Sequence, residues 1–124
     1  MDGIVTLLPP RPSSAGVARE VVAWQLHEWH IECLCEDASV IVTELISNAV
    51  RHARTAVELK MVHLPDGVRM EVRDGSRKPL RKRPCGQDDE GGRGLHLVDA
   101  LSSRHGVDDD GDGKRVWVEM LTPA

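Results

Sequence analysis

Aromatic residues are scarce in this 124-residue sequence, which has three tryptophans and no phenylalanine or tyrosine. Sites for single-stranded nucleic acids usually stack bases on aromatic side chains, so the basic stretch at 77–83, which contains none, does not predict such a site. The formal net charge of −4 gives no general attraction for polyanions. We therefore expect no direct nucleic-acid binding, and a core filled by aliphatic side chains.

Cysteine and long apolar runs are also scarce. Three cysteines are an odd number and favour a reducing compartment over a disulfide scaffold. No stretch approaches the roughly 20 apolar residues of a membrane span. The first ten residues carry Asp2 in place of a basic region, and their apolar run is too short for a signal peptide. We therefore expect a cytoplasmic protein with no membrane segment.

The length predicts a single domain over residues 1–124. Three prolines among residues 9–12 indicate an irregular N-terminal segment over 1–12, and Ser13 or Ser14 then offers an N-cap hydroxyl. Helical spacing of apolar residues and alternating β-branched stretches predict the remaining elements. In chain order these are helices at 15–30 and 36–52, strands at 55–62 and 68–73, a polar loop at 77–91, a helix from 94, and strands at 103–107 and 115–121.

This order groups the first helices together and joins the first two of these strands by a hairpin-like turn at 64–67. A mostly antiparallel sheet covered by helices on one face fits it better than a doubly wound parallel sheet. The predicted fold class is therefore α+β, a two-layer sandwich.

The second predicted helix carries a polar stripe. Glu44, Asn48 and His52 are four residues apart and lie in line along one face. A carboxylate beside an amide oxygen suits Mg²⁺, which takes oxygen ligands and recruits phosphates for the remainder. Taken alone, the stripe also fits the solvated face of an amphipathic helix.

Two further segments carry chemistry. Asp74 follows a strand directly, where a buried carboxylate can accept hydrogen bonds from an exocyclic amine and so distinguish adenine from guanine; Asp-Gly pairs also mark simple turns. The glycine-rich stretch at 91–94 precedes a helix, whose free N–H groups attract phosphate, and Arg93 adds a charge there. This glycine-rich stretch matches neither a Walker loop nor the dinucleotide-binding fingerprint. Taken alone, it fits a plain glycine-rich loop as well as it fits a phosphate-binding turn.

The order and spacing of these segments closely resemble the histidine-kinase-like ATPase superfamily, which includes gyrase, sensor kinases and the MutL repair proteins. Within it, the stretches TELISNAVRHA, VRDGS and GRGLHLV are similar to anti-sigma-factor serine kinases and their actinobacterial relatives. The resemblance covers most of the chain. It implies an α/β sandwich that binds ATP with Mg²⁺ between helices and sheet, under a lid at 77–91.

The resemblance also implies roles for individual residues. Glu44 would be the general base that orients a partner's serine hydroxyl, and Asn48 would bind Mg²⁺. Asp74 would take the adenine amino group. The complete set of implied nucleotide-binding residues is Asn48, His52, Asp74, Ser76, Gly92, Arg93, Gly94 and Leu95.

Two positions depart from the family pattern. Many members have D-x-G-x-G at the adenine motif, whereas this chain has Ser76 and Arg77 after Asp74-Gly75. Relatives commonly have a threonine after glycine and lysine before the last strand, and here Gly113-Lys114 precedes Arg115. Arg115 would either weaken nucleotide binding or point outward.

Two functions follow from the resemblance. The first is a serine kinase that phosphorylates a small anti-anti-sigma partner, with a sigma factor as the other partner. The second is a non-catalytic switch of the same fold with weak or lost nucleotide binding. The resemblance leaves a homodimer open and suggests Arg19, on the first helix, as a partner contact.

Two smaller expectations concern the end of the first helix. Four residues, His27, His30, Cys33 and Cys35, have the composition of a zinc site, but their spacing matches no common zinc pattern. A helix end with favourable histidines is the better interpretation. On the same helix we expect Trp24 to pack and Trp29 to be partly exposed.

Overall fold

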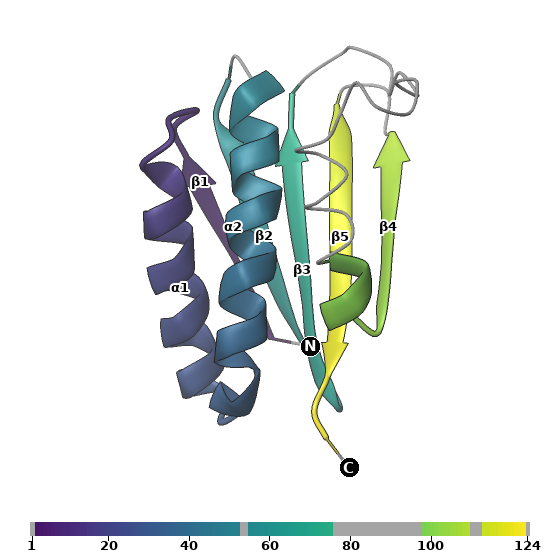
Figure 1. The fold of residues 1–124 in the computed structure, drawn as a ribbon. Coiled ribbons are helices and arrows are strands. Elements are labelled where there is room, and N and C mark those ends of the chain that lie inside the picture. The colour runs from purple at the N-terminus through teal and green to yellow at the C-terminus, as the bar shows by residue number, and fades with distance from the viewer. Residues whose placement is uncertain (1, 53–54, 76–97, 110–112, 124) are drawn as a thin grey trace.

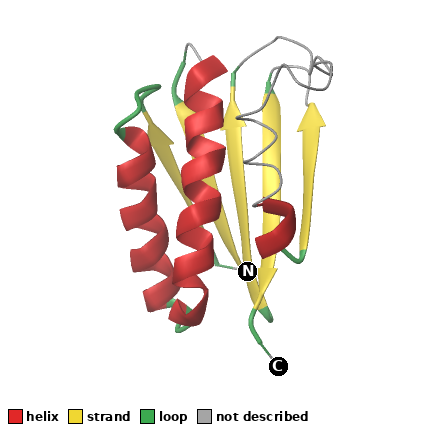
Figure 2. Cartoon of the chain, viewed as in Figure 1, coloured by secondary structure: helices red, strands yellow, loops and turns green. Residues whose placement is uncertain are grey.

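The fold is a two-layer sandwich of one antiparallel sheet and helices that cover one of its faces (Figures 1 and 2). The computed structural model describes residues 2–52, 55–75, 98–109 and 113–123. The sheet order is β1-β2-β3-β5-β4, and all pairings are antiparallel. The predicted α+β class is therefore confirmed. The elements are β1 (Gly3–Leu8), α1 (Ser14–Glu28), the 3₁₀ turn η1 (Glu32–Leu34), α2 (Cys35–His52), β2 (Val57–Leu64), β3 (Gly67–Asp74), β4 (Arg104–Asp109) and β5 (Lys114–Leu121).

The helices and the hairpin agree closely with the sequence predictions. The turn between β2 and β3 brings Leu64 opposite Gly67. A Cβ at Gly67 would lie 1.9 Å from the Met120 carbonyl oxygen on β5, so only glycine fits this close approach. Of the predicted third helix, residues 98–101 are described and are helical; its start and the loop at 77–91 lie outside the described residues.

The expectation of an irregular segment over 1–12 is wrong, because residues 3–8 form β1 and pair with β2. The prolines interrupt regular structure only after Leu8, where the chain leaves the sheet. The expected side-chain cap is also absent. Ser13 is the N-cap without a side-chain hydrogen bond, and the buried Ser14 hydroxyl donates to the Pro9 carbonyl at 2.6 Å.

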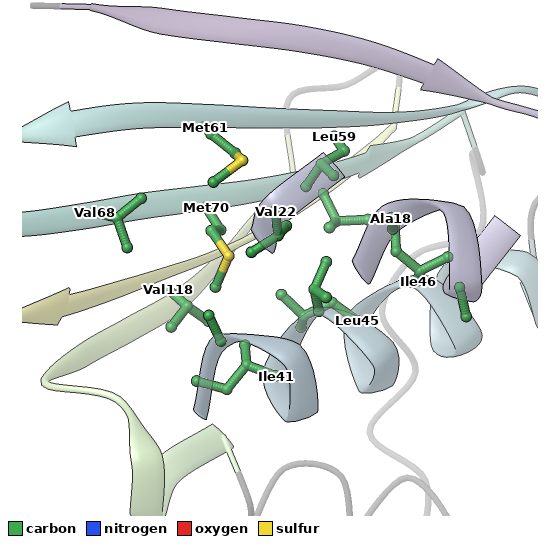
Figure 3. Packing of buried hydrophobic residues seen from close by; sticks show 14 of the residues in the cluster. Ala18, Val22, Ile41, Leu45, Ile46, Leu59, Met61, Val68, Met70 and Val118 are labelled. Atoms are coloured by element: carbon green, nitrogen blue, oxygen red, sulfur yellow. The ribbon is translucent and has the colours of Figure 1, made fainter. Parts of the chain in front are cut away.

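The core lies between the two helices and the sheet and is aliphatic, as the sequence indicates. Apolar side chains of α2 face those of β3 and β5, with Ile41 and Leu45 close to Met70 and Val118 (Figure 3). On α1, Ala18, Val22 and Leu26 are fully buried. No helix of the described residues is long and apolar enough to span a membrane.

Of the two tryptophans of the first helical region, Trp29 is partly exposed, as expected, whereas the expectation that Trp24 packs is wrong. Trp24 is 63% exposed, whereas Trp29 packs against the core and stacks on His63, with ring centroids 4.8 Å apart. Position on the helix decides which side chains reach the sheet. Trp24 lies on the face of α1 away from the buried residues Ala18 and Val22, so its side chain is exposed.

The sheet face opposite the helices carries a network of charges. Arg69 on β3 donates to Glu71 at 2.7 Å and to Glu119 on β5 at 2.9 Å, and its guanidinium lies 4.4 Å from the centroid of the Trp117 ring. Burial lowers the pKa of Arg69, but the hydrogen bonds and charges of the two glutamates outweigh it, so the pKa is raised. This cation therefore joins the two central strands on the open face.

Replacing Arg69 with glutamine should lower the free energy of unfolding by about 1 kcal/mol, since two largely buried carboxylates lose their shared cation. The matched control is Arg104→Gln. Arg104 is 73% exposed and 3.8 Å from Glu119, so its loss should cost less than about 0.5 kcal/mol. Urea unfolding of both variants measures the difference, and equal losses would contradict a central role for Arg69.

Candidate functional site

The best candidate site lies at the end of the sandwich where α2 and β3 finish and β5 begins (Figure 1). α2 packs against β3, so the last turns of this helix lie over the strand ends. The family-implied residues of α2 and β3 are therefore brought to the same end of the molecule, on the side of the sheet that the helices cover.

Asp74 is the most unusual residue of this region. It is the last residue of β3, follows the buried alternation of Val68, Met70 and Val72, and is only 2% exposed. That alternation directs its carboxylate to the helix side of the sheet. Buried carboxylates are rare unless they are paired, and Asp74 does have an interaction within the protein.

Glycines and a threonine pack tightly around the backbone at Asp74. A Cβ on Gly113 would lie 2.1 Å from the Asp74 carbonyl oxygen, and one on Gly75 would lie 2.8 Å from the Thr55 hydroxyl oxygen. The Gly113 turn therefore approaches the Asp74 backbone to a distance that only glycine allows, whereas a side chain at Gly75 would require Thr55 to move. Sequence reasoning did not identify Thr55 or the contact of Gly113, because neither has a local signal that connects it to Asp74.

The α2 stripe has the predicted geometry. Glu44 and Asn48 are half-buried and lie one helical turn apart, and His52 is exposed at the last residue of the helix. Their neighbours Leu45, Ile46 and Ala49 are buried in the core and fix the rotation of the helix. Glu44 and Asn48 thus lie at the boundary between core and solvent.

Arg115 points away from this region. Its Nε lies 3.2 Å from a carboxylate oxygen of Glu71 on the open face of the sheet. Because strand side chains alternate, Lys114 is on the helix side, where its register partner is Asp74. The sequence left two alternatives for Arg115, weaker nucleotide binding or an outward side chain, and the structure supports the outward side chain.

The remaining family-implied residues, Ser76, Gly92, Arg93, Gly94 and Leu95, lie outside the described residues. So does the predicted lid at 77–91. The site that the structure describes therefore consists of the α2 stripe and the surroundings of Asp74.

The zinc interpretation at the end of α1 has no support. All four candidate side chains are described, and the described residues contain no group of three or more that could hold a metal ion. Cys33 is exposed, and Cys35 is partly buried with its thiol 3.9 Å from the Ala23 carbonyl oxygen. Burial, with the charges of Glu32 and Cys33, raises the pKa of the Cys35 thiol above its ordinary value.

Comparison with known proteins finds similar proteins both by sequence and by structure. Uncharacterized protein SCO4941 of Streptomyces coelicolor is 36% identical over 83 residues, 63% of this chain and 79% of that protein. The crystal structure of the RsbU and RsbW domains of Rv1364c from Mycobacterium tuberculosis aligns with all of this chain at a TM-score of 0.68 and 21% identity. The structure of the histidine kinase AdeS from Acinetobacter baumannii aligns with all of this chain at a TM-score of 0.60 and 10% sequence identity. The two solved structures show that the fold is shared. This chain covers 34% of the length of the Rv1364c chain and 70% of the length of the AdeS chain.

A family model described as the histidine kinase-like ATPase domain matches residues 8–120. The match runs from the end of β1 to the end of β5 and therefore includes both helices, the α2 stripe and Asp74. The chain belongs to the histidine kinase-like ATPase domain family.

Proposed function

We propose that this protein binds ATP at the end of the sandwich and uses it as a serine kinase of the anti-sigma type, acting on a small regulatory protein. The observation that carries the proposal is the burial of Asp74. A carboxylate 2% exposed, held on the helix side between close-packed glycines, is suited to accept a hydrogen bond from an exocyclic amine. At its C6 position adenine carries such an amine, whereas guanine carries a carbonyl oxygen there.

Oxygen donors for a metal are on α2. Asn48 would hold Mg²⁺ through its amide oxygen, and bound phosphates would complete the coordination. When bound, the ion would neutralise charge on the phosphates. Membership of the ATPase domain family supports this assignment.

Glu44 would supply the base, one turn before Asn48 and half-buried. In the proposed reaction the oxygen of a partner's serine hydroxyl attacks the γ-phosphorus of ATP. The bond between that phosphorus and the β–γ bridging oxygen breaks, ADP leaves, and the hydroxyl proton passes to the Glu44 carboxylate. The proposed substrate is an anti-anti-sigma protein, with a sigma factor as the alternative partner. The structural similarity to the Rv1364c chain, which contains an RsbW domain, supports this class of partner.

The binding half of the proposal is tested by titrating MgATP and MgGTP calorimetrically into the wild type and Asp74→Asn. The wild type should prefer ATP. The variant should bind ATP about tenfold more weakly, because the asparagine NH₂ would face the adenine amine, and its preference over GTP should shrink.

The control is Asp66→Asn, the same change in the exposed turn between β2 and β3, which should bind as the wild type does. The shift in base preference separates a direct contact from general damage to the fold. Wild-type protein that is folded but binds neither nucleotide would leave only the non-catalytic, partner-binding switch.

A further inference from the structure

Lys114 brings a positive charge directly beside Asp74. It is the first residue of β5, and its register partner is Asp74, the last residue of β3. Directly opposed residues of an antiparallel pair project their side chains from the same face of the sheet, with Cβ atoms about 4.5–5.5 Å apart. The lysine side chain therefore starts next to the buried carboxylate.

The face of the sheet that Lys114 takes follows from the rest of β5. Val118 and Met120 are buried, and Val116 packs against the same core, so the even-numbered residues of this strand face the helices. Lys114 continues this series and is half-buried. Arg115 lies on the open face. The Lys114 side chain therefore belongs to the candidate site and not to the charge network of the open face.

Acidic residues flank Lys114 on both neighbouring strands, Asp74 on β3 and Asp109 on β4. Either carboxylate could hold the ammonium, but within the described ranges no ion pair or side-chain hydrogen bond includes Lys114. Asp74 and Asp109 each have an interaction of their own. A lysine carries three N–H donors, and a half-buried ammonium gains from an acceptor. These donors are therefore available to a ligand that binds beside Asp74.

The base of ATP offers a donor and an acceptor side by side. In adenine the amine at C6 is the donor that Asp74 would accept, and the neighbouring ring nitrogen N1 is an acceptor. Guanine has the reverse pattern at these two positions, because it carries an oxygen at C6 and a hydrogen on N1. A carboxylate and an ammonium on adjacent strands therefore match adenine at both positions and guanine at neither.

The C6 amine also has the ring nitrogen N7 as a neighbour, on the other edge of the base. An ammonium there would not select adenine, since lysine and arginine donate readily to N7 and O6 of guanine. An ammonium at N1 meets an N–H in guanine and therefore disfavours that base. Of the two nitrogens, only N1 is consistent with a site that prefers ATP to GTP.

We propose that Lys114 is a base-specificity residue, whose ammonium donates to N1 of adenine while Asp74 accepts a hydrogen bond from the amine. The inference rests on the proposed ATP site and adds a second contact to it. The two side chains would read two adjacent atoms on one edge of the base. Because the lysine carries a full charge, its hydrogen bond to N1 is stronger than one between neutral groups.

The test is calorimetric titration of the Mg²⁺ complexes of ATP, 1-deaza-ATP and 7-deaza-ATP into the wild type and Lys114→Met. 1-Deaza-ATP keeps the amine and the triphosphate but has a C–H group in place of N1. The wild type should bind it about tenfold more weakly than ATP and should bind 7-deaza-ATP as tightly as ATP. Lys114→Met should bind ATP about tenfold more weakly than the wild type does and should not distinguish ATP from 1-deaza-ATP.

The control is Lys60→Met, the same change at an exposed lysine of β2 on the open face, which should keep the wild-type selectivity. Methionine is unbranched like lysine, so Lys114→Met should pack similarly, and its melting temperature without nucleotide checks this. Equal affinity of the wild type for ATP and 1-deaza-ATP would overturn the inference, and that comparison needs no variant.

Two further outcomes distinguish this inference from the ATP site on which it rests. If Lys114→Met weakens ATP and 1-deaza-ATP by the same factor, the ammonium contacts the phosphates, and the contact with N1 is wrong. The ATP site and the contact of Asp74 would then still stand. Wild-type protein that is folded but binds no ATP would overturn both the site and the inference.

Discussion

Glu44→Gln should reduce phosphoryl transfer from ATP by about 10²- to 10⁴-fold while leaving ATP affinity within about threefold of the wild type. Glutamine keeps the length and the helix propensity of the side chain but cannot take a proton. Because Glu44 is half-buried and its neighbour Leu45 holds α2 against the sheet, the helix should stay in place. The predicted effect is therefore on turnover alone.

The measurement is the rate of ADP formation, with water accepting the phosphoryl group in place of a serine hydroxyl. The matched control is Glu36→Gln, an exposed glutamate two turns earlier on the same helix, which should leave the rate unchanged. Turnover by Glu44→Gln at the wild-type rate would exclude this residue as the base.

Gly113→Ala should both destabilise the fold and weaken ATP binding. The new Cβ would lie 2.1 Å from the Asp74 carbonyl oxygen and 3.3 Å from the Gly75 Cα, both backbone atoms that cannot rotate away. β3 and β5 must therefore separate at the end that carries the site. We expect a loss of about 1–3 kcal/mol in unfolding free energy and a fall of roughly 4–12 °C in melting temperature.

The control is Gly16→Ala within α1, where the added Cβ meets only the end of the Arg19 side chain, at 3.5 Å. Alanine favours a helix over glycine, so this variant should be more stable by about 0.5–1 kcal/mol. Calorimetric melting of both variants, with and without MgATP, gives stability and binding together. A Gly113→Ala protein as stable as the wild type would contradict the close packing at Asp74.

Much of the architecture is local and was therefore predictable. The apolar spacing on α2, from Ile41 to Ala49, specifies both a helix and the face that it buries. The turn at Pro65-Asp66-Gly67, between alternating β-branched stretches, specifies the β2–β3 hairpin. The polar stripe of Glu44, Asn48 and His52 follows from the same helical period. These features depend on residues close together in the sequence, so the chain by itself determined them.

The tertiary structure decided the features that depend on distant partners. β1 is a strand because β2, some fifty residues later, supplies its hydrogen bonds. Arg115 points outward because its position on β5 opposite β3 brings it to Glu71. Gly113 reaches the Asp74 backbone, and Thr55 reaches Gly75, only when three separate turns meet. Hydrogen bonding and close packing act between atoms that folding brings together, and sequence periodicity reports only which face a side chain takes.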